Sequence, residues 1–345
     1  MSKTETVYNI LRKRLEKSLY PPGTRFPSES TLATEFSVNK MTMNKIVSML
    51  AERGFLVRGG RGSGTLVADY KAKARGLIAF QANIHTYTAL VLRGVVAEAA
   101  RNNFMVIMET PRIEELQHRM ELLKSQGVTG IISMGYGVPD VPEGMRLVCV
   151  DSNFLPDPAG KVRVINSDNF QGGALMMKEI LRRGHRDILI FSSERFVMNR
   201  DASITPRVQG FHSVMRSAGI RDFEARTFYS APNSSADCRE FLRSYLKKYP
   251  GATLIAADSD YAAELLYKEA LQLGVDCPGK IALTGFGNIT LLPIASVDQA
   301  PERQGELAAR FLASFQEDER EKLQLVDTSL TGVEHIPILT NNGKI

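Results

Sequence analysis

The sequence of residues 40–50 is KMTMNKIVSML, and its pattern of apolar and polar side chains decides how the first domain is interpreted. Apolar residues recur at i, i+3, i+4 and i+7, a spacing that gathers them on one face of an α-helix. The segment therefore predicts an amphipathic helix whose outer face is basic and bears an amide. The apolar positions are Met43, Ile46, Val47 and Leu50, and the opposite face carries Lys40, Asn44, Lys45 and Ser48.

Two further helices are predicted upstream of this one. Residues 7–15 carry apolar side chains at helical spacing, and residues 20–23 (YPPG) end that helix with turn residues. Ser28 can cap a short second helix, since a serine oxygen accepts well from the free backbone N–H groups of a first turn. The side chains expected to point inward from these two helices are Val7, Ile10, Leu11, Leu15, Leu32, Ala33 and Phe36.

A hairpin is predicted after the third helix. Gly54 can end that helix, because glycine adopts the left-handed backbone that many helix ends require. Two short strands at 55–57 and 65–67 then flank a basic, glycine-rich tip at residues 58–64. Three helices followed by a hairpin is the order of a winged helix-turn-helix domain.

This arrangement suits contact with DNA. In the major groove, a lysine such as Lys40 can reach guanine O6 and N7, and Asn44 can pair with adenine. At the hairpin tip, Arg58 or Arg61 can enter the narrow minor groove. Residues 1–75 hold 14 Lys and Arg against 6 Asp and Glu, a net charge of +8, whereas the remaining residues carry −3. The basic excess predicts a polyanionic partner for the first segment, although a solvated helix with a loop shows the same local pattern.

Four segments, in the right order, resemble the winged-helix heads of the GntR family. They are residues 22–29 (PGTRFPSE), 37–43 (SVNKMTM), 52–56 (ERGFL) and 60–67 (GRGSGTLV). The resemblance implies DNA contacts at the start of the second helix, at the start of the third helix and at the hairpin tip. Together with the outer helix face, it predicts the DNA-binding set Glu29, Ser30, Asn39, Lys40, Thr42, Asn44, Lys45, Arg58, Arg61, Gly62 and Ser63.

Three positions depart from the usual pattern of that family. Ser30 stands where many members have Arg, Asn39 and Lys40 replace a Ser-Arg pair, and Asn44 replaces a second Arg. Since these positions are expected to contact DNA, the operator sequence is expected to differ from the commonest family consensus.

The rest of the chain predicts a second, larger domain. Residues 70–75 are polar and lack periodicity, as in a linker, so the domains are expected at 1–69 and 76–345. Beyond residue 76, apolar runs alternate with helical stretches in two βαβ series, which predicts two lobes with parallel sheets. The fold class is therefore α/β: a winged helix-turn-helix plus a two-lobed domain. Expected strands are 77–80, 104–108, 128–134, 146–150, 188–191, 253–256 and 281–285, with one near Thr227; expected helices include one carrying Val91, Val95, Val96 and Ala99, one around 116–123, and 168–183, 206–218, 235–248 and 260–273.

The larger domain resembles the lactose/galactose-repressor family and its periplasmic sugar-binding relatives. The matching segments include residues 92–100 (LRGVVAEAA), 167–173 (SDNFQGG), 207–211 (RVQGF) and 283–287 (LTGFG). A periplasmic-binding-protein-like domain behind a GntR-type head resembles the arabinose-repressor architecture. The resemblance implies an effector-binding and dimerisation domain with ligand contacts on loops after strands: His85, Thr86, Tyr87, Asp151, Arg207, Asp258, Asn288 and Gln299.

These ligand residues favour a small polar effector, a sugar or sugar derivative. An arginine and two carboxylates that oppose one another suit hydrogen bonding to hydroxyl groups. Gly287, followed by Asn288, stands where sugar-binding members of the family have an aspartate. A usual hydroxyl acceptor is thus missing, and the ligand is not expected to be an ordinary pentose or hexose.

Structural roles remain open for several of these residues. Arg207 can be a surface arginine at a helix start, Asp151 and Asp258 can cap turns and helices, and His85 can be an ordinary loop residue. His185, which follows a glycine, is expected to pack against a helix end and not to bind ligand.

Composition limits the remaining possibilities. The charged N-terminus lacks the apolar core of a signal peptide, and no apolar run reaches the eighteen residues of a membrane span, so a cytoplasmic protein is expected. Cys149, Cys238 and Cys277 are widely spaced, without the pattern of a disulfide framework or metal site, and are expected to be buried thiols.

No enzyme activity and no cofactor are expected. Gly59 and Gly64 have the spacing that begins a P-loop, but Thr65 and Leu66 replace the residues that would hold phosphate and magnesium. The common hydrolase and metalloprotease motifs are absent from the sequence. A solute-binding protein fits residues 76–345 alone. The expectation for the whole chain is a homodimeric repressor that binds operator DNA and responds to a small effector.

Overall fold

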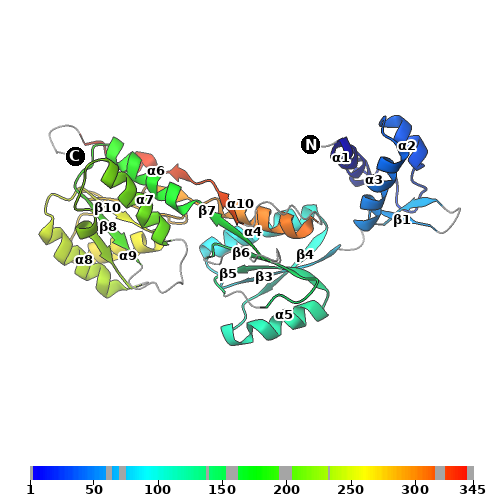
Figure 1. The fold of residues 1–345 in the computed structure, drawn as a ribbon. Coiled ribbons are helices and arrows are strands. Elements are labelled where there is room, and N and C mark those ends of the chain that lie inside the picture. The colour runs from blue at the N-terminus through cyan, green and yellow to red at the C-terminus, as the bar shows by residue number, and fades with distance from the viewer. Residues whose placement is uncertain are drawn as a thin grey trace. The chain divides into compact units, whose positions relative to one another are not determined.

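The computed structural model describes residues 3–59, 64–69, 75–136, 140–152, 162–193, 204–231, 234–314 and 323–339 (Figure 1). The chain forms two compact units. One comprises Met1–Leu77 with Ala99–Met105, and the other comprises Ile78–Glu98 with Val106–Ile345. None of the helices in these ranges is both long and apolar enough to cross a membrane.

The first unit has the predicted order of helix, helix, helix and hairpin. Its elements are α1 (Lys3–Glu16), α2 (Glu29–Glu35), α3 (Lys40–Glu52), β1 (Leu56–Arg58) and β2 (Thr65–Val67). Strand β1 pairs antiparallel with β2, with Leu56 opposite Val67. The Ser28 side chain accepts from the N–H of Thr31, which confirms the cap of the second helix. Gly54 has φ +73°, which confirms the left-handed end of the third.

The inward position predicted for Ile10 is wrong, and Val96, one of the apolar residues that marked an expected helix, also faces outward. Ile10 in α1 is 38% exposed and Val96 in α4 (Thr86–Arg101) is 47% exposed. In each helix the buried residues recur every four positions, so the apolar stripe drifts around the helix. At about 100° of rotation per residue, Ile10 and Val96 both lie about 100° from the centre of their stripe. Tyr8, on the other side of the α1 stripe, is buried instead.

The second unit contains two large sheets, each covered by helices (Figure 1), and a two-stranded sheet of β12 and β14. The larger sheet has six strands in the order β13-β7-β6-β5-β3-β4, and the smaller has four in the order β11-β10-β8-β9. Parallel pairing joins β5 to β6, β6 to β7 and β7 to β13 in the first, and β8 to both β9 and β10 in the second. The α/β architecture with parallel sheets is therefore confirmed. The bounds are β3 Gly76–Ala82, β4 Phe104–Glu109, α5 Leu116–Ser125, β5 Val128–Met134, β6 Arg146–Val150, β7 Val162–Ser167, α6 Asn169–Arg182, β8 Ile188–Ser192, α7 Ile204–Ser217, β9 Thr227–Tyr229, α8 Ser235–Lys248, β10 Leu254–Ala257, α9 Asp260–Leu273 and β11 Ala282–Thr284.

The six-stranded sheet belongs to the first lobe and the four-stranded sheet to the second. The chain crosses between these two lobes more often than two successive βαβ series would require. After the second lobe it returns through β12 (Ser296–Asp298) to α10 (Pro301–Ala313), which packs on β5, β6 and β7. Strand β13 (Leu323–Val326) then joins the sheet of the first lobe, and β14 (Ser329–Thr331) pairs antiparallel with β12. These elements and β7 were not among the predicted strands and helices. The three cysteines are buried and free, as expected.

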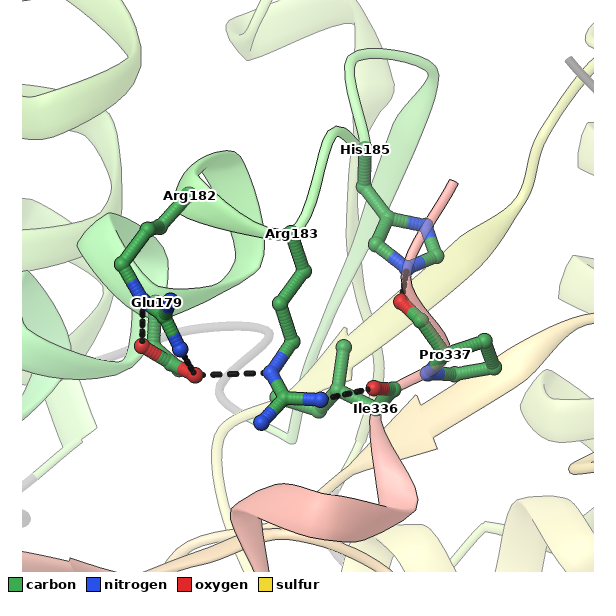
Figure 2. A network of polar contacts seen from close by, with 6 residues as sticks. All are labelled: Glu179, Arg182, Arg183, His185, Ile336 and Pro337. Carbon is green, nitrogen blue, oxygen red and sulfur yellow. Dashed lines mark hydrogen bonds and ion pairs between the residues drawn. The ribbon is translucent and has the colours of Figure 1, made fainter. Parts of the chain in front are cut away.

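The end of the described chain is attached to the second lobe by a polar network (Figure 2). The Arg183 guanidinium donates to the carbonyl of Ile336 at 2.6 Å, and Nε2 of His185 lies 2.9 Å from the carbonyl of Pro337. Nδ1 of His185 lies 2.9 Å from the hydroxyl of Thr253 on the other side. His185 is fully buried in this network, so it packs at the end of α6 as expected.

Candidate DNA-binding and ligand-binding sites

The outer face of α3 is exposed and basic. Met43, Ile46 and Leu50 are fully buried on the inner face, so packing fixes which side of the helix turns outward. Lys40 and Lys45 are exposed on the outer face. Asn39 is the N-cap, and its Oδ1 accepts from the N–H of Thr42 at 2.6 Å. These two predicted DNA contacts, Asn39 and Thr42, therefore also hold the first turn of the helix that carries the lysines.

Three of the predicted DNA-binding residues form one cluster. The amide nitrogen of Asn44 donates to both carboxylate oxygens of Glu29, at 3.0 and 3.1 Å. Nη2 of Arg58 donates to the same carboxylate at 3.2 Å, to the backbone carbonyl of Asn44 at 3.2 Å and to the Ser48 hydroxyl at 2.9 Å. The Arg58 guanidinium therefore lies beside α3. The minor-groove role of Arg58 stays a prediction.

Of four further predicted DNA contacts, only Ser30 lies within the described residues. Ser30 is exposed in the first turn of α2, and its carbonyl accepts from the Thr34 hydroxyl. Arg61, Gly62 and Ser63, predicted at the hairpin tip, lie outside the described residues.

Arg207 forms the centre of the candidate ligand site. It belongs to α7, it is only 5% exposed, and its guanidinium stacks 4.2 Å from the centre of the Phe286 ring. Nε donates to Oδ1 of Asn169 at 3.0 Å, and Nη1 donates to the carbonyl of Asp258 at 3.0 Å. The alternative of a surface arginine is therefore wrong. Gly173 brings α6 close to α7 here, because a Cβ on it would lie 2.2 Å from the Arg207 carbonyl oxygen.

Asn169 connects Arg207 to Gln299. The Gln299 side chain is buried and donates to Oδ1 of Asn169 at 3.2 Å. Two residues predicted separately, Arg207 and Gln299, thus share one acceptor. Asn169 was not among the predicted ligand residues, although it stands in a segment, 167–173, that carried the family resemblance. Its burial and its two partners become evident only in the folded chain.

A second buried cluster lies beside the first. Nε2 of Gln304, on α10, donates to the Tyr87 hydroxyl at 2.8 Å, to the Ser167 hydroxyl at 2.8 Å and to the carbonyl of Gln299 at 2.9 Å. Burial, together with the nearby carboxylate of Asp151, raises the pKa of Tyr87. Tyr87 therefore stays a neutral hydroxyl whose oxygen is already engaged by Gln304. No local pattern pointed to Gln304, since α10 was not predicted.

Asp258 is fully buried and holds its own lobe together in this structure. Its carboxylate accepts from the hydroxyls of Ser192 and Ser259 at 3.1 Å each, and from both the N–H and the hydroxyl of Ser193 at 2.6 and 3.0 Å. Burial raises the pKa of the Asp258 carboxyl, against the bonds from Ser193 and the nearby charge of Arg207. These contacts tie the end of β8 to the start of α9, so Asp258 is placed to position Arg207 through its backbone carbonyl.

The contacts given for three other predicted ligand residues, His85, Thr86 and Asp151, do not include Arg207. His85 and Thr86 are exposed at the start of α4, and Nδ1 of His85 lies 3.3 Å from the hydroxyl of Tyr261 in the second lobe. Partial burial lowers the pKa of His85. Asp151 follows β6 in a left-handed conformation, with φ +50°, and its N–H donates to the carbonyl of Ile165.

Asn288 joins the crossover strands. Its amide nitrogen donates to Asp298 at 3.0 Å, and its amide oxygen accepts from the Thr331 hydroxyl at 3.0 Å. It lines a pocket of about 480 Å³ with residues at the start of α10. The preceding Gly287 has φ +130°, which L side chains rarely adopt, so a substitution of this glycine would strain the backbone.

The arrangement can bind a polar ligand through neutral and cationic groups. Arg207, Asn169 and Gln299 come from two helices and a crossover segment, and together they offer several donors around one acceptor. No group of three His, Cys, Asp or Glu side chains placed to hold a metal ion occurs among the described residues.

Comparison with known proteins finds a match for each of the two parts of the chain. Residues 3–67 match the model for bacterial regulatory proteins of the gntR family, and residues 177–333 match a periplasmic binding protein-like domain. The chain is 22% identical to the arabinose metabolism transcriptional repressor of Geobacillus stearothermophilus, over 80% of this chain and 79% of that protein. It is 23% identical to the HTH-type transcriptional regulator GntR of Escherichia coli K12, over 70% and 74%.

A solved structure shows the same fold. A LacI family transcriptional regulator from Enterococcus faecium, with bound ribose, superposes with a TM-score of 0.63 at 18% identity. The match covers 76% of this chain and all of that one. The similarity in the larger domain is therefore one of architecture.

Proposed function

We propose that this chain, which joins a GntR-type helix-turn-helix domain to a periplasmic-binding-protein-like domain, is a ligand-responsive transcriptional repressor. The observation that carries the proposal is the outer face of α3. Its lysines are exposed, while the apolar residues on the opposite side are completely buried. A rigid basic helix of this kind fits the major groove, where a helix-turn-helix places its recognition helix.

The proposed effector is a small sugar-like molecule whose supply would govern a carbohydrate-utilisation operon. The support is the buried Arg207, Asn169 and Gln299 cluster, which suits hydroxyl groups. Relatives named as arabinose repressors and a neighbour with bound ribose have the same overall architecture. Gly287 leaves out one acceptor that sugar-binding relatives use, so a derivative fits better than a simple sugar.

The proposed assembly is a homodimer in the cytoplasm, with residues 1–69 binding DNA, 70–75 as linker, and 76–345 binding effector and partner. Two copies of α3 would contact two half-sites of a roughly palindromic operator. Neither a catalytic step nor a cofactor is required for this function. Effector binding would shift an equilibrium between two arrangements of the lobes, by as much as its affinity for them differs.

Selection from a pool of random duplexes with the full chain tests the proposal. Expected is enrichment of one inverted repeat, bound with an affinity that falls steeply with salt because Lys and Arg contacts displace counterions from phosphates. A screen of sugars and sugar derivatives by thermal shift should then identify ligands that change the affinity for the selected site.

A different outcome favours the alternative, a solute-binding protein without a DNA function. That outcome is a set of ligands that raise the melting temperature of the protein, together with no enrichment of any DNA sequence. A double variant, Lys40→Ala with Lys45→Ala, separates the two, since only DNA binding should suffer in it.

A further inference from the structure

The outer face of α3 also carries an apolar side chain, Met41, which is 83% exposed. With about 100° between successive residues, the direction of Met41 falls between those of Ser48 and Lys45, and about 60° from that of Asn44. Lys40 and Lys45 mark the two edges of the same face. Met41 therefore lies within the predicted DNA-binding surface and not at its margin.

Packing does not account for this methionine. The core of the first unit is filled by buried residues that include Met43, Ile46 and Leu50, and Met41 is not among the residues packed against it. The N-cap bond from Thr42 to Asn39 holds the first turn, so the backbone at Met41 is fixed before any partner binds. An exposed thioether between cationic side chains, on a backbone that is already held, suits an apolar feature on an anionic partner.

In the major groove that feature is the C5-methyl group of thymine, the one apolar group that base edges present there. Recognition helices of the helix-turn-helix type place their N-terminal residues against base edges, and Met41 is the second residue of α3. Methionine is flexible and polarisable, which suits contact with a methyl group at the floor of a groove.

We propose that Met41 contacts a thymine methyl in each operator half-site and thereby specifies a T·A pair beside the base pairs contacted by Lys40 and Asn44. The inference rests on the proposed function, since it requires α3 to lie in the major groove. It adds a base preference that lysine and asparagine chemistry does not supply.

The test removes the methyl group and leaves the base pair intact. In the site selected from random duplexes, each thymine is replaced in turn by deoxyuridine, and the affinity of the full chain is measured. Expected is a loss of about fourfold at one position in each half-site, as for one methyl group withdrawn from an apolar contact. The variant Met41→Ala should bind thymine and uracil equally at that position, and Met41→Leu should retain part of the discrimination.

A matched control is Met105→Ala, at a methionine that is 60% exposed on β4, which should keep the full response to deoxyuridine. Equal affinity for thymine and uracil at every position would overturn the inference while leaving the proposed function intact. So would a uracil effect that Met41→Ala does not remove. Failure to select any specific site would overturn the proposed function together with the inference.

Discussion

The amide nitrogen of Asn44 on α3 donates hydrogen bonds to both carboxylate oxygens of Glu29 at the start of α2. These two bonds orient the side-chain amide of Asn44 so that its nitrogen faces Glu29. A carboxylate at a DNA-binding surface would repel phosphates, but Arg58 donates to the same group and offsets its charge. Glu29 is therefore a positioning residue for Asn44, and Arg58 is its counter-ion.

The first prediction concerns this pair. Asn44→Ala should weaken binding at the selected site by about 1–3 kcal/mol and relax the preference at one base pair, because a bidentate contact is lost. Glu29→Ala should relax the preference at the same base pair, since the amide is no longer oriented. Affinities over a library of single-base variants of the site measure both effects. The losses should not add in the double variant; strict additivity would mean that Glu29 does not act through Asn44.

The second prediction separates the helix from the hairpin tip. Lys40→Ala should cost about 1–3 kcal/mol and relax the preference at one base pair, because Lys40 is expected to contact a base. Arg61→Ala should weaken binding to all sequences by a similar factor and reduce the slope of log affinity against log salt by about 1. The same library and a salt titration distinguish them. Identical profiles for the two variants would contradict the placing of the helix and the hairpin.

The third prediction concerns the effector. Arg207→Ala should leave operator binding roughly unchanged but abolish the response to effector concentrations that saturate the parent protein, because the guanidinium supplies the main fork of donors. Operator binding with and without effector is the measurement. Arg216→Ala, at an exposed position on the same helix, should respond normally and serves as the control.

Stability has to be measured alongside, because Arg207 is buried and bonds to Asn169 and Asp258. A thermal melt of Arg207→Lys, which keeps the charge but loses the planar fork, separates folding from ligand binding. A normal effector response in a stably folded Arg207→Lys or Arg207→Ala protein would place the ligand contacts elsewhere.

The fourth prediction concerns pH and the network of Figure 2. Burial lowers the pKa of His185, with the charge of Arg183 acting in the same direction and the carbonyl of Pro337 against it. The folded state thus binds the proton less readily than the unfolded chain, whose His pKa is about 6.5. The stability contributed by neutral His185 is present above about pH 6.5 and is lost as the pH falls from there towards the folded pKa.

Urea unfolding between pH 5 and pH 7.5 measures this. The free energy of unfolding of the parent should be smaller at pH 5 than at pH 7.5. In His185→Gln it should be smaller throughout and should change less with pH. His212, whose pKa burial also lowers, keeps part of the dependence in that variant. His118→Gln, at an exposed histidine, is the control and should follow the parent. An unchanged slope in His185→Gln would show that His185 does not titrate across folding.

The sequence alone was sufficient for the order of helices and strands in the first domain. Its helices and hairpin follow from local periodicity, from Ser28 and Gly54 at helix ends, and from glycine at the turn, all of which act within a few residues. The outer face of α3 could be predicted because burying Met43, Ile46 and Leu50 leaves Lys40 and Asn44 outside. The α/β character of the larger domain could be predicted for the same reason, from the alternation of apolar runs and amphipathic stretches.

Only the tertiary structure decided how the candidate ligand site is assembled. Gln299 and Asn169 are 130 residues apart in the sequence, and Gln304 and Ser167 are 137 apart. They meet because the chain returns from the second lobe through β12 and α10. No local sequence pattern predicts this crossover. Periodicity reports which face of an element is buried but not which element buries it. The family resemblance pointed to Arg207, but its partner Asn169, the contacts of Gln304 and the pairing of Asn44 with Glu29 required the fold, because periodicity does not identify partners.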